Sequence, residues 1–192
     1  MAYSDGDAGY QQGTTMETDE LKLLIKALAF ASACHRNQRR KDRDASPYIN
    51  HPIALTDVLV NEGQVTDPET LCAALLHDVI EDTEATEAEL AVLFGPTITA
   101  IVVEVTDDES MDKRARKQAQ IERAPLLSVQ AKAIKLADKI ANLRDVVANP
   151  PPDWSHARRR EYFDWAKQVI DGLRGDHPHL EEVFDAQFAE RP

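Results

Sequence analysis

The sequence predicts an all-α fold, a compact bundle of short helices. Apolar residues recur at three- and four-residue steps through most of the chain, which is the period of an amphipathic helix. Capping residues and helix-ending Gly and Pro residues separate these segments. No stretch alternates between apolar and polar residues as a half-buried strand would. With 192 residues, a single domain has enough chain to bury a sizeable core.

The helical pattern begins after a polar N-terminal stretch. Residues 1–17 are polar and aperiodic, so we expect a disordered tail there and one folded domain over residues 18–192. A short helix is expected over residues 53–61, after His51-Pro52. The next helix begins at Thr66-Asp67-Pro68-Glu69, where a capping side chain, an early Pro and an early acid coincide.

The second half of the chain continues in the same way. A capping box, Thr86-Glu87-Ala88-Glu89, opens a helix that should end at Gly95-Pro96. Residues 97–106 are rich in β-branched side chains, so a helix is favoured there and a strand is the alternative. The remaining helices are expected near residues 112–123, 128–148, 155–174 and 177–190, with a proline-rich break at 149–153 and Gly175 as the cap of the third.

The chain is acidic, with 34 Asp and Glu residues against 22 Lys and Arg residues and a formal net charge of −12. A field of this sign disfavours generic binding to nucleic acid or to an anionic membrane, and we expect neither as a partner. No apolar run approaches the roughly 18 residues of a membrane-spanning helix, and the N-terminus lacks the features of a signal peptide. We therefore expect a cytoplasmic protein, either a monomer or a homodimer.

The most informative stretch is residues 73–82, where an apolar run is interrupted by His77, Asp78, Glu81 and Asp82. In a continuous helix these four side chains fall on one arc, and apolar residues cover the rest of the circumference. Like charges at this spacing repel each other, so something must offset the cost. A divalent cation is the simplest candidate. The alternative interpretation is a helix end with solvated acids.

Two further residues carry side chains suited to metal binding. His51 precedes Pro52, which favours an extended backbone at His51 and places it just before a helix. Asp138 shares a polar face with Lys135, Asn142 and Asp145, and periodicity alone predicts that this face is solvated. From spacing alone, a structural or exposed role remains the alternative for both residues.

Two basic clusters stand out in this acidic chain, residues 35–43 and Arg158-Arg159-Arg160. As solvated surface they need no explanation. As part of a site they are informative, because guanidinium groups match phosphate oxygens in pairs. Local Arg clusters within a negative overall field would select a compact, highly charged anion rather than a polymer.

Five longer strings carry a family resemblance. They are His35-Arg36-Asn37-Gln38-Arg39-Arg40-Lys41, Pro47-Tyr48-Ile49-Asn50-His51-Pro52, Ala73-Ala74-Leu75-Leu76-His77-Asp78 with Glu81-Asp82, Glu104-Val105-Thr106-Asp107-Asp108, and Lys135-Leu136-Ala137-Asp138-Lys139 with Asn142-Leu143-Arg144-Asp145. Together they resemble the hydrolase domain of RelA/SpoT proteins, in the HD superfamily of phosphohydrolases. The chain length and the segments Trp154-Ser155 and Glu161-Tyr162-Phe163 are similar to the small alarmone hydrolases, the group of the metazoan SpoT homologue. The resemblance covers about residues 20–190 and implies the HD-domain phosphohydrolase fold.

The resemblance implies one bound metal ion, usually Mn²⁺, although another divalent transition metal can take its place. Its ligands would be His51, His77, Asp78 and Asp138. Two imidazoles and two carboxylates leave coordination positions for water and substrate. Glu81 and Asp82 match the family's catalytic acidic pair, which would orient or deprotonate the water and manage protons at the leaving oxygen.

The resemblance also implies a small-molecule nucleotide polyphosphate as the partner of the site. The positions that match the family's substrate-binding residues are Arg40, Lys41, Tyr48, Asn142, Arg158 and Tyr162. The first two would approach the substrate, Tyr48 would pack on the nucleotide, and the last two would grip the distal phosphate and sugar. Arg160 departs from the pattern of the animal relatives.

The leading hypothesis is therefore a Mn²⁺-dependent guanosine-3′,5′-bis(diphosphate) 3′-pyrophosphohydrolase, which yields GDP or GTP and pyrophosphate. The same site could instead remove the 2′-phosphate of NADPH or hydrolyse an adenosine alarmone, because the residues indicate an anion site and not the base. An alternative of another class is an HD module that binds a nucleotide without cleaving it. The intact acidic pair speaks against that module, since a sensor needs no group that activates water.

Overall fold

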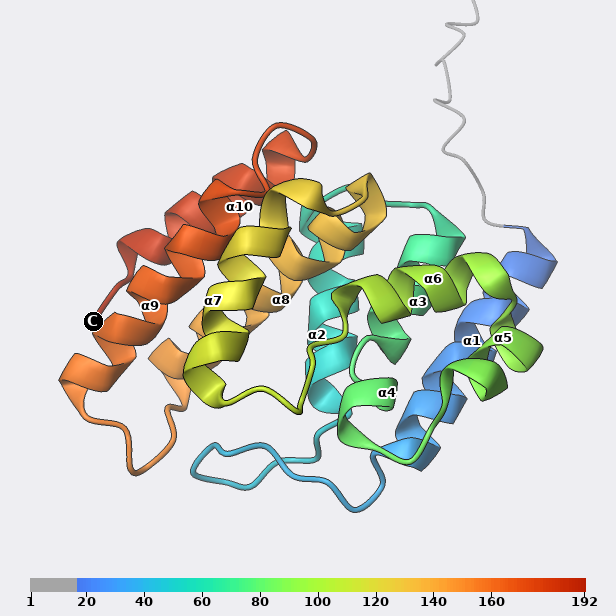
Figure 1. Cartoon of the computed structure of the whole chain (residues 1–192), viewed down its shortest axis with the longest axis horizontal. Helices are drawn as coiled ribbons and strands as arrows, with labels where there is room; N and C mark the ends of the chain where they lie inside the picture. Colours follow the sequence, from blue (N-terminus) through green and yellow to red (C-terminus); the bar gives the residue numbers. More distant parts are fainter. Residues whose placement is uncertain (1–16) are drawn as a thin grey trace, which may run out of the picture.

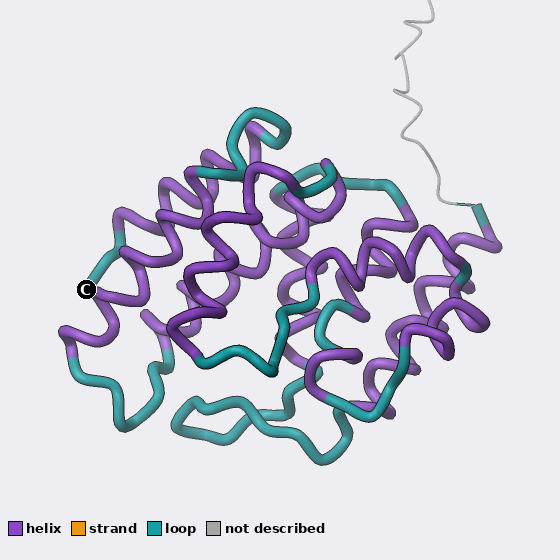
Figure 2. The backbone as a smooth tube through the Cα atoms, viewed as in Figure 1, coloured by secondary structure: helices purple, strands orange, loops and turns teal. Residues whose placement is uncertain are grey.

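The computed structural model describes residues 17–192 and is helical through most of that range (Figures 1 and 2). The α-helices are α1 (Thr18–Cys34), α2 (Asn50–Asp57), α3 (Pro68–Leu76), α4 (Val79–Asp82), α5 (Glu87–Phe94), α6 (Pro96–Val105), α7 (Lys113–Arg123), α8 (Val129–Ala148), α9 (His156–Asp171) and α10 (Pro178–Ala189). A π-helical segment, η1 (Val58–Glu62), extends α2, and a 3₁₀ segment, η2 (Ala124–Leu126), follows α7. Within the described residues there is no strand, only an isolated bridge between Arg39 and Pro47. The all-α prediction is confirmed.

Helices α2, α3 and α8 form the centre of the molecule. In Figure 1, α1, α3, α5 and α6 lie on one side of α2, and α7 to α10 lie on the other. Helix α3 packs against α1, α2, α6 and α8, while α8 also contacts α2, α9 and α10. Side chains at the ends of α2 and α3 and in the middle of α8 therefore meet between the two halves.

Helix α3 is covered on all sides. Every residue from Thr70 to Leu76 is buried, as expected for a helix that is apolar over most of its circumference. Asp67 caps its first turn, accepting the backbone N–H of Thr70 at 2.9 Å, and Pro68 occupies a first-turn position where no intrahelical bond is lost. Because its surroundings are close-packed, α3 is a rigid support for the residue that follows it.

Capping side chains begin the later helices where the sequence predicts. Thr86 accepts the N–H of Glu89, Ser128 that of Ala131, and Ser155 that of Arg158, each at 3.2 Å. The β-branched stretch 97–106 forms helix α6 rather than a strand. Its side chains at Ile98, Ile101, Val102 and Val105 lie in the core, so burial decides the conformation over intrinsic propensity.

The predicted end of the 155–174 helix is wrong. Helix α9 ends at Asp171, and its cap is Gly172 rather than Gly175. The N–H groups of Gly172 and Leu173 bond to carbonyls three residues earlier, which tightens and ends the last turn. Gly175 lies in the turn that follows, with a φ of 116° that side-chain-bearing residues rarely adopt.

The expected disordered tail, residues 1–17, lies outside the described residues except for Glu17. The backbone N–H of Glu17 donates to the Glu20 carboxylate at 2.8 Å and so fixes the start of α1. Across residues 17–192, none of the helices combines the length and apolar character needed to span a bilayer.

Candidate metal centre and substrate pocket

Three buried side chains converge where α2, α3 and α8 meet. His51 in α2, His77 just after α3 and Asp138 in α8 have exposed fractions of 4%, 5% and 9%. One possible ligand atom from each lies within 4.8 Å of the other two. His51 Nε2 lies 3.1 Å from Asp138 Oδ1. Segments that are far apart in the sequence thus build one cluster of nitrogen and oxygen donors.

The imidazole of His77 is oriented by the helix that precedes it. Its Nδ1 lies 2.8 Å from the carbonyl oxygen of Ala74, which can only accept a hydrogen bond. Nδ1 therefore carries a proton, and Nε2 is the nitrogen left to bind a metal. Burial opposes a charge on this ring, but the Asp78 carboxylate beside Nε2 raises the pKa of His77, so Nε2 must lose a proton when a metal binds. A histidine that donates one ring N–H to a backbone carbonyl is the usual arrangement for a metal ligand.

The helix predicted through residues 73–82 is interrupted. Helix α3 ends at Leu76, His77 and Asp78 form a turn, and the separate helix α4 begins at Val79. Asp78 has φ −103° and ψ 0°, outside the range of a regular helix. Side-chain bonds from these two residues to Ala74 and Tyr48 hold the turn, and neither contact is visible in the local sequence. The acidic pair thus lies in α4, after the turn that contains His77.

The expectation that His51 lies in extended chain before a helix is also wrong. Helix α2 begins at Asn50, so His51 and Pro52 both lie in its first turn. A proline is tolerated there because the first N–H groups of a helix have no intrahelical partner. The preference of a residue before proline for extended backbone is overridden, and His51 is presented from a helix instead of a loop.

Asp138 is buried, contrary to the prediction from periodicity. Helix α8 is covered by α2, α3 and α6 on one side and by α9 and α10 on the other, so its central turns have no solvated face. Asp138 and Asn142, on the stripe that periodicity assigned to solvent, instead bond to each other within the site. Only the exposed Asp145, two turns further along α8, fulfils that prediction.

Neighbouring side chains fix the Asp138 carboxylate. Lys139 Nζ lies 2.7 Å from Oδ2, and the amide of Asn142 donates to Oδ1 at 2.6 Å. Lys139 is itself buried and lies 4.7 Å from the ring centroid of Trp165. Although burial opposes ionisation, Lys139 and His51 hold the pKa of Asp138 well below its usual range. The carboxylate is therefore charged at neutral pH.

Asp78 lies beside this cluster. Its Oδ2 accepts a hydrogen bond from the Tyr48 hydroxyl and is 2.8 Å from His77 Nε2. Burial opposes its charge, but the adjacent His77 keeps the pKa of Asp78 well below its ordinary value. Burial also lowers the pKa of His51, which favours the neutral imidazole. Ionised carboxylates and a neutral ring are the forms that bind metals.

This donor set fits a divalent metal ion. His51 Nδ1 is fully buried and has no hydrogen-bond partner, and His77 Nε2, although 2.8 Å from Asp78 Oδ2, makes no well-aligned hydrogen bond. Buried polar atoms in this state are costly unless something else satisfies them. Imidazole nitrogens combined with carboxylate oxygens suit first-row transition metals such as Mn²⁺ and Fe²⁺. Two negative charges next to two ring nitrogens can balance the charge of such an ion.

The two acids of α4 differ in their surroundings. Glu81 is half-buried, and its Oε2 accepts the backbone N–H of Asp107 at 2.9 Å. Burial raises the pKa of Glu81 to about 7, and the negative charge of Asp78 adds to that effect. Asp82 is exposed and accepts a hydrogen bond of 2.8 Å from the Gln38 amide. Glu81 has the properties of a general base that works near neutral pH.

A cavity of about 370 Å³ adjoins the cluster. Five of the six predicted substrate-binding residues line it, together with Gln38, Asp82, Asp145 and Trp154; the five are Arg40, Lys41, Tyr48, Asn142 and Tyr162. Arg40 Nη2 donates to Asn142 Oδ1 at 3.0 Å and to Asp145 Oδ2 at 2.5 Å. Tyr48 and Asn142 connect the cavity to the cluster, because each bonds to one of the carboxylates described above.

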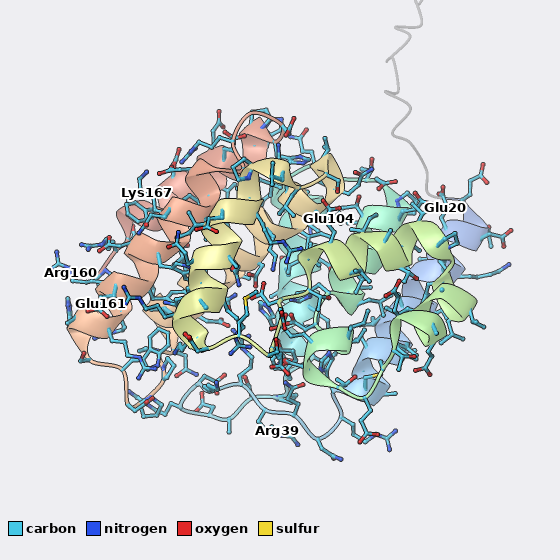
Figure 3. The ribbon with its side chains drawn as sticks, viewed as in Figure 1. Glu20, Arg39, Glu104, Arg160, Glu161 and Lys167 are labelled. Atoms are coloured by element: carbon cyan, nitrogen blue, oxygen red, sulfur yellow. The ribbon has the colours of Figure 1, made fainter. Side chains whose placement is uncertain are left out.

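The sixth predicted residue, Arg158, lies outside this cavity. It lines a neighbouring one that shares Trp154 and Tyr162 with the first, and its guanidinium stacks 4.8 Å from the Trp154 ring centroid. Arg160 instead extends from the outer side of α9 (Figure 3) and is exposed. Of the cluster Arg158-Arg159-Arg160, the first side chain is thus the one beside the cavities.

Three residues hold this site in place, although sequence reasoning placed His35 and Gln38 only in the basic cluster of residues 35–43 and gave no role to Lys139. The His35 ring packs on the Tyr48 ring with centroids 4.7 Å apart, and Gln38 bridges His35 to Asp82. Lys139 compensates the charge of Asp138. The signal that could have identified Lys139 is its place on the otherwise buried face of α8, where an unpaired charge would be costly.

Comparison with known proteins identifies the family of this chain. The HD domain family matches residues 27–166. The guanosine-3′,5′-bis(diphosphate) 3′-pyrophosphohydrolase MESH1 of Danio rerio is 48% identical over 176 residues, covering 92% of this chain and 98% of its own length. The human MESH1 is 47% identical over 172 residues, covering 90% and 96%.

Two further comparisons extend the relationship. The bifunctional (p)ppGpp synthase/hydrolase SpoT of Escherichia coli strain K12 is 34% identical over 187 residues, which represent 93% of this chain but 26% of SpoT. The solved structure of a metazoan ortholog of SpoT, a protein that hydrolyses ppGpp, matches with a TM-score of 0.87 at 46% identity, covering 93% of this chain and 98% of that one. The family resemblance is confirmed, and the chain belongs to the HD domain family, in the group that contains the MESH1 proteins.

Proposed function

We propose that this protein is a metal-dependent hydrolase that removes the 3′-pyrophosphate of guanosine-3′,5′-bis(diphosphate) and its pentaphosphate form, and that Mn²⁺ is its ion. The observation that carries the proposal is the buried cluster of His51, His77 and Asp138 beside a cavity with Arg40 and Lys41 in its wall. The curated relatives that cover almost the same length are named for this activity.

In the proposed mechanism, His51, His77, Asp78 and Asp138 hold the ion. When bound, a divalent ion supplies Lewis-acid activation of water and neutralises phosphate charge. Lys139 and Asn142 keep the Asp138 carboxylate oriented and ionised. Tyr48 does the same for Asp78 through its hydroxyl. These supporting bonds set the ligand geometry before the substrate arrives.

Glu81 accepts the proton of the attacking water, since burial gives it a pKa suited to that transfer. Attack at the phosphorus next to the ribose breaks its bond to the 3′-oxygen, and pyrophosphate leaves the 3′-position. The freed 3′-oxygen needs a proton, and the exposed Asp82 in the cavity wall relays it from solvent. The products are GDP or GTP and pyrophosphate.

The cavity wall supplies the substrate contacts. Arg40 is bonded to Asn142 and Asp145, and phosphate oxygens can replace those acceptors with a bidentate contact. Lys41 is exposed and adds a second positive charge. Tyr48, Trp154 and Tyr162 offer aromatic faces for the base and ribose. Arg158 lies one cavity further and is assigned to the distal phosphates.

A substrate panel tests the proposal. The purified protein is stripped of metal with a chelator, reloaded with Mn²⁺, and assayed with guanosine tetra- and pentaphosphate, an adenosine alarmone and NADPH. We expect pyrophosphate release from the guanosine compounds, with the highest kcat/KM of the panel, and no turnover before Mn²⁺ is restored. A higher kcat/KM for NADPH or the adenosine compound would replace the assigned substrate.

The same experiment separates an enzyme from a binding module. Metal content is measured by elemental analysis, and nucleotide affinity by calorimetry, on the preparation used for turnover. Tight binding without turnover in the metal-loaded protein would identify a sensor and overturn the proposal.

A further inference from the structure

Glu81 depends on a distant turn for its orientation. It belongs to α4, a helix of four residues that is too short to be rigid on its own. The hydrogen bond recorded for its carboxylate is the 2.9 Å contact from the backbone N–H of Asp107 to Oε2. Asp107 follows α6, so the direction of that N–H is set by whatever holds the turn after α6.

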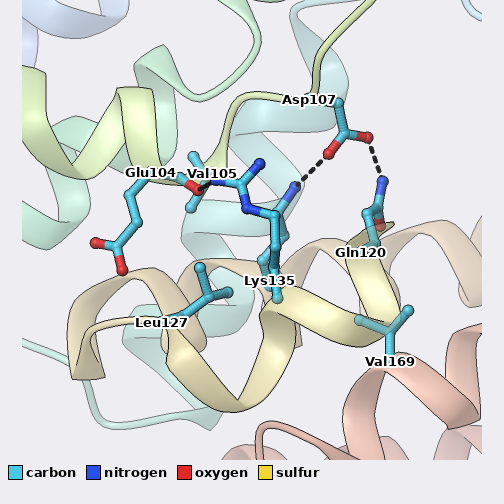
Figure 4. Close-up of a pocket in the computed structure, with 8 residues that line it drawn as sticks. Glu104, Val105, Asp107, Gln120, Leu127, Lys135 and Val169 are labelled. Carbon is cyan, nitrogen blue, oxygen red and sulfur yellow. Dashed lines mark hydrogen bonds and ion pairs between the residues drawn. The ribbon is translucent and has the colours of Figure 1, made fainter. Parts of the chain in front are cut away.

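That turn is held by a clamp of two side chains on different helices (Figure 4). The Gln120 amide, from α7, donates to Asp107 Oδ2. Lys135, from α8, places Nζ 3.9 Å from Asp107 Oδ1. The Asp107 and Lys135 side chains are only 16% and 14% exposed, so solvent weakens their attraction little. One carboxylate thus ties the turn to α7 and α8 at once.

These residues cannot act on a substrate directly. The space they enclose with Glu104, Arg123 and Leu127 is about 10 Å³. A cavity needs roughly 10–15 Å³ to hold even one water molecule. Neither Asp107 nor Gln120 lines the large cavity that contains Arg40. The contact that joins the clamp to the acidic pair is the hydrogen bond from the Asp107 N–H to Glu81.

We propose that Gln120, Asp107 and Lys135 are positioning residues that hold Glu81 in the geometry for proton transfer. The inference rests on the proposed function, in which Glu81 is the base. Loss of the clamp should slow the chemical step without affecting metal retention or substrate binding. The proposed metal ligands and the basic residues of the cavity are held by other bonds.

The balance of charges agrees with this role. Burial has the largest effect on Glu81 and raises its pKa. The largest effect in the opposite direction comes from the hydrogen bond of the Asp107 N–H, which favours the ionised carboxylate and lowers the pKa. The Lys135 ammonium acts in the same direction, and the Asp107 carboxylate opposes it. A clamp that keeps the N–H in place therefore stabilises the form of Glu81 that accepts a proton.

The test compares Gln120→Met with Gln118→Met. Gln118 lies on the same helix, is exposed and bonds to Glu122 instead, so it controls for the loss of a glutamine from α7. In Gln120→Met we expect kcat to fall about ten- to hundredfold, as for a misplaced catalytic group, with KM within about twofold of wild type. Mn²⁺ content should stay unchanged, and the midpoint of the pH–rate profile should move upward. Gln118→Met should match the wild type.

A second pair of variants tests rescue. Asp107→Asn keeps one oxygen acceptor for Lys135, and its NH2 group can donate to the Gln120 amide oxygen once that amide rotates, whereas Asp107→Ala removes both contacts. The first variant should therefore retain most of the kcat that the second loses. Equal losses in the two variants would overturn the inference. So would a parallel rise in KM or a loss of Mn²⁺ in Gln120→Met, because a general structural defect would explain both.

A measurement without substrate separates this inference from the proposed function. The titration of the Glu81 carboxyl carbon is followed by ¹³C NMR in the metal-free protein, with Glu81→Gln to assign the signal. The midpoint should rise in Gln120→Met and stay fixed in Gln118→Met. If the wild type does not hydrolyse the alarmone, this titration still reports on the clamp, and an unchanged midpoint in Gln120→Met overturns it.

Discussion

At the level of single residues, burial divides the acidic and imidazole groups of the site into two sets. The imidazoles and Asp138 lie in the core with donors and acceptors already arranged around them, whereas Glu81 and Asp82 lie at the boundary with solvent. The first set can hold an ion in fixed geometry. The second set can exchange protons with water. A hydrolase needs both properties, and here different degrees of exposure supply them.

Substitutions in the two sets should therefore fail in different ways. Asp138→Ala removes a buried ligand and leaves Lys139 with an uncompensated charge, so we expect it to lose Mn²⁺ on dialysis and to be destabilised by about 3–5 kcal/mol. Glu81→Gln should retain the ion and lose about 100-fold or more in kcat. Elemental analysis and turnover on the same samples check both results. Normal turnover in Glu81→Gln would contradict the assigned base.

The pH dependence should report Glu81. Burial raises its pKa to about 7 from an ordinary 4.5, and the base is active only when ionised. We therefore expect kcat/KM to rise about tenfold per pH unit below pH 7 and to level off above it. Glu81→Gln should lose this limb of the profile. A limb that persists in the variant would assign the titration to another group.

The sequence could select candidate site residues, which the structure brings close together, but it could not predict their environments. His51, His77 and Asp138 carry donor atoms that suit a metal, and the family strings select them. Periodicity nevertheless assigns Asp138 to solvent, because a repeat in one helix contains no information about helices that cover it later in the fold. The three clamp residues were missed for the same reason, since their contacts cross between elements.

Among the elements, α8 has the largest share of the site. It contributes Asp138, Asn142 and the clamp residue Lys135, so its start and register determine where three groups lie. Ser128 fixes that start by accepting the N–H of Ala131 and by donating to the Glu104 carboxylate at 2.7 Å. A cap that is also bonded to α6 aligns α8 with the core.

Loss of this cap should lower stability measurably. Ser128→Ala removes both bonds, and we expect a cost of about 1–2 kcal/mol. For a chain of this length, that corresponds to a fall in Tm of about 3–6 °C by calorimetry. Ser110→Ala, in an exposed turn, should change Tm by less than about 1 °C and serves as the control. Equal changes in Tm in the two variants would show that the Ser128 cap stabilises the fold no more than an exposed serine does.

The boundaries of elements could be predicted where a local capping residue sets them, as at Asp67, Thr86, Ser128 and Ser155. They could not be predicted where contacts from elsewhere set them. No Gly or Pro marks the end of α3, and the bond of the Asp78 carboxylate to Tyr48 holds the turn that follows. The start of α2 at Asn50 likewise contradicts the local preference before Pro52.

At the scale of the whole molecule, the site joins the two halves of the bundle. The proposed ligands come from α2, from the segment after α3 and from α8, all of which pack against one another. An ion bound there links all three, so its binding free energy becomes part of the free energy of unfolding.

Stability should consequently depend on metal concentration. At Mn²⁺ about 100-fold above its Kd, the folded state gains about 2.7 kcal/mol. We expect Tm to rise by about 5–10 °C on adding Mn²⁺ to metal-free protein and to return on adding a chelator. Asp138→Ala should show no such rise. A Tm that is insensitive to Mn²⁺ in the wild type would contradict the metal site.

The turn at His77 and Asp78 has an evolutionary consequence. The proposed metal ligands His77 and Asp78 precede α4, and the proposed proton-transferring pair lies within it. A few changes in residues 79–82 could therefore abolish turnover while leaving the fold and the ion in place. Such a descendant would still capture its nucleotide and would release it unaltered. The architecture therefore offers a short mutational route from a catalyst to a receptor for the same signal.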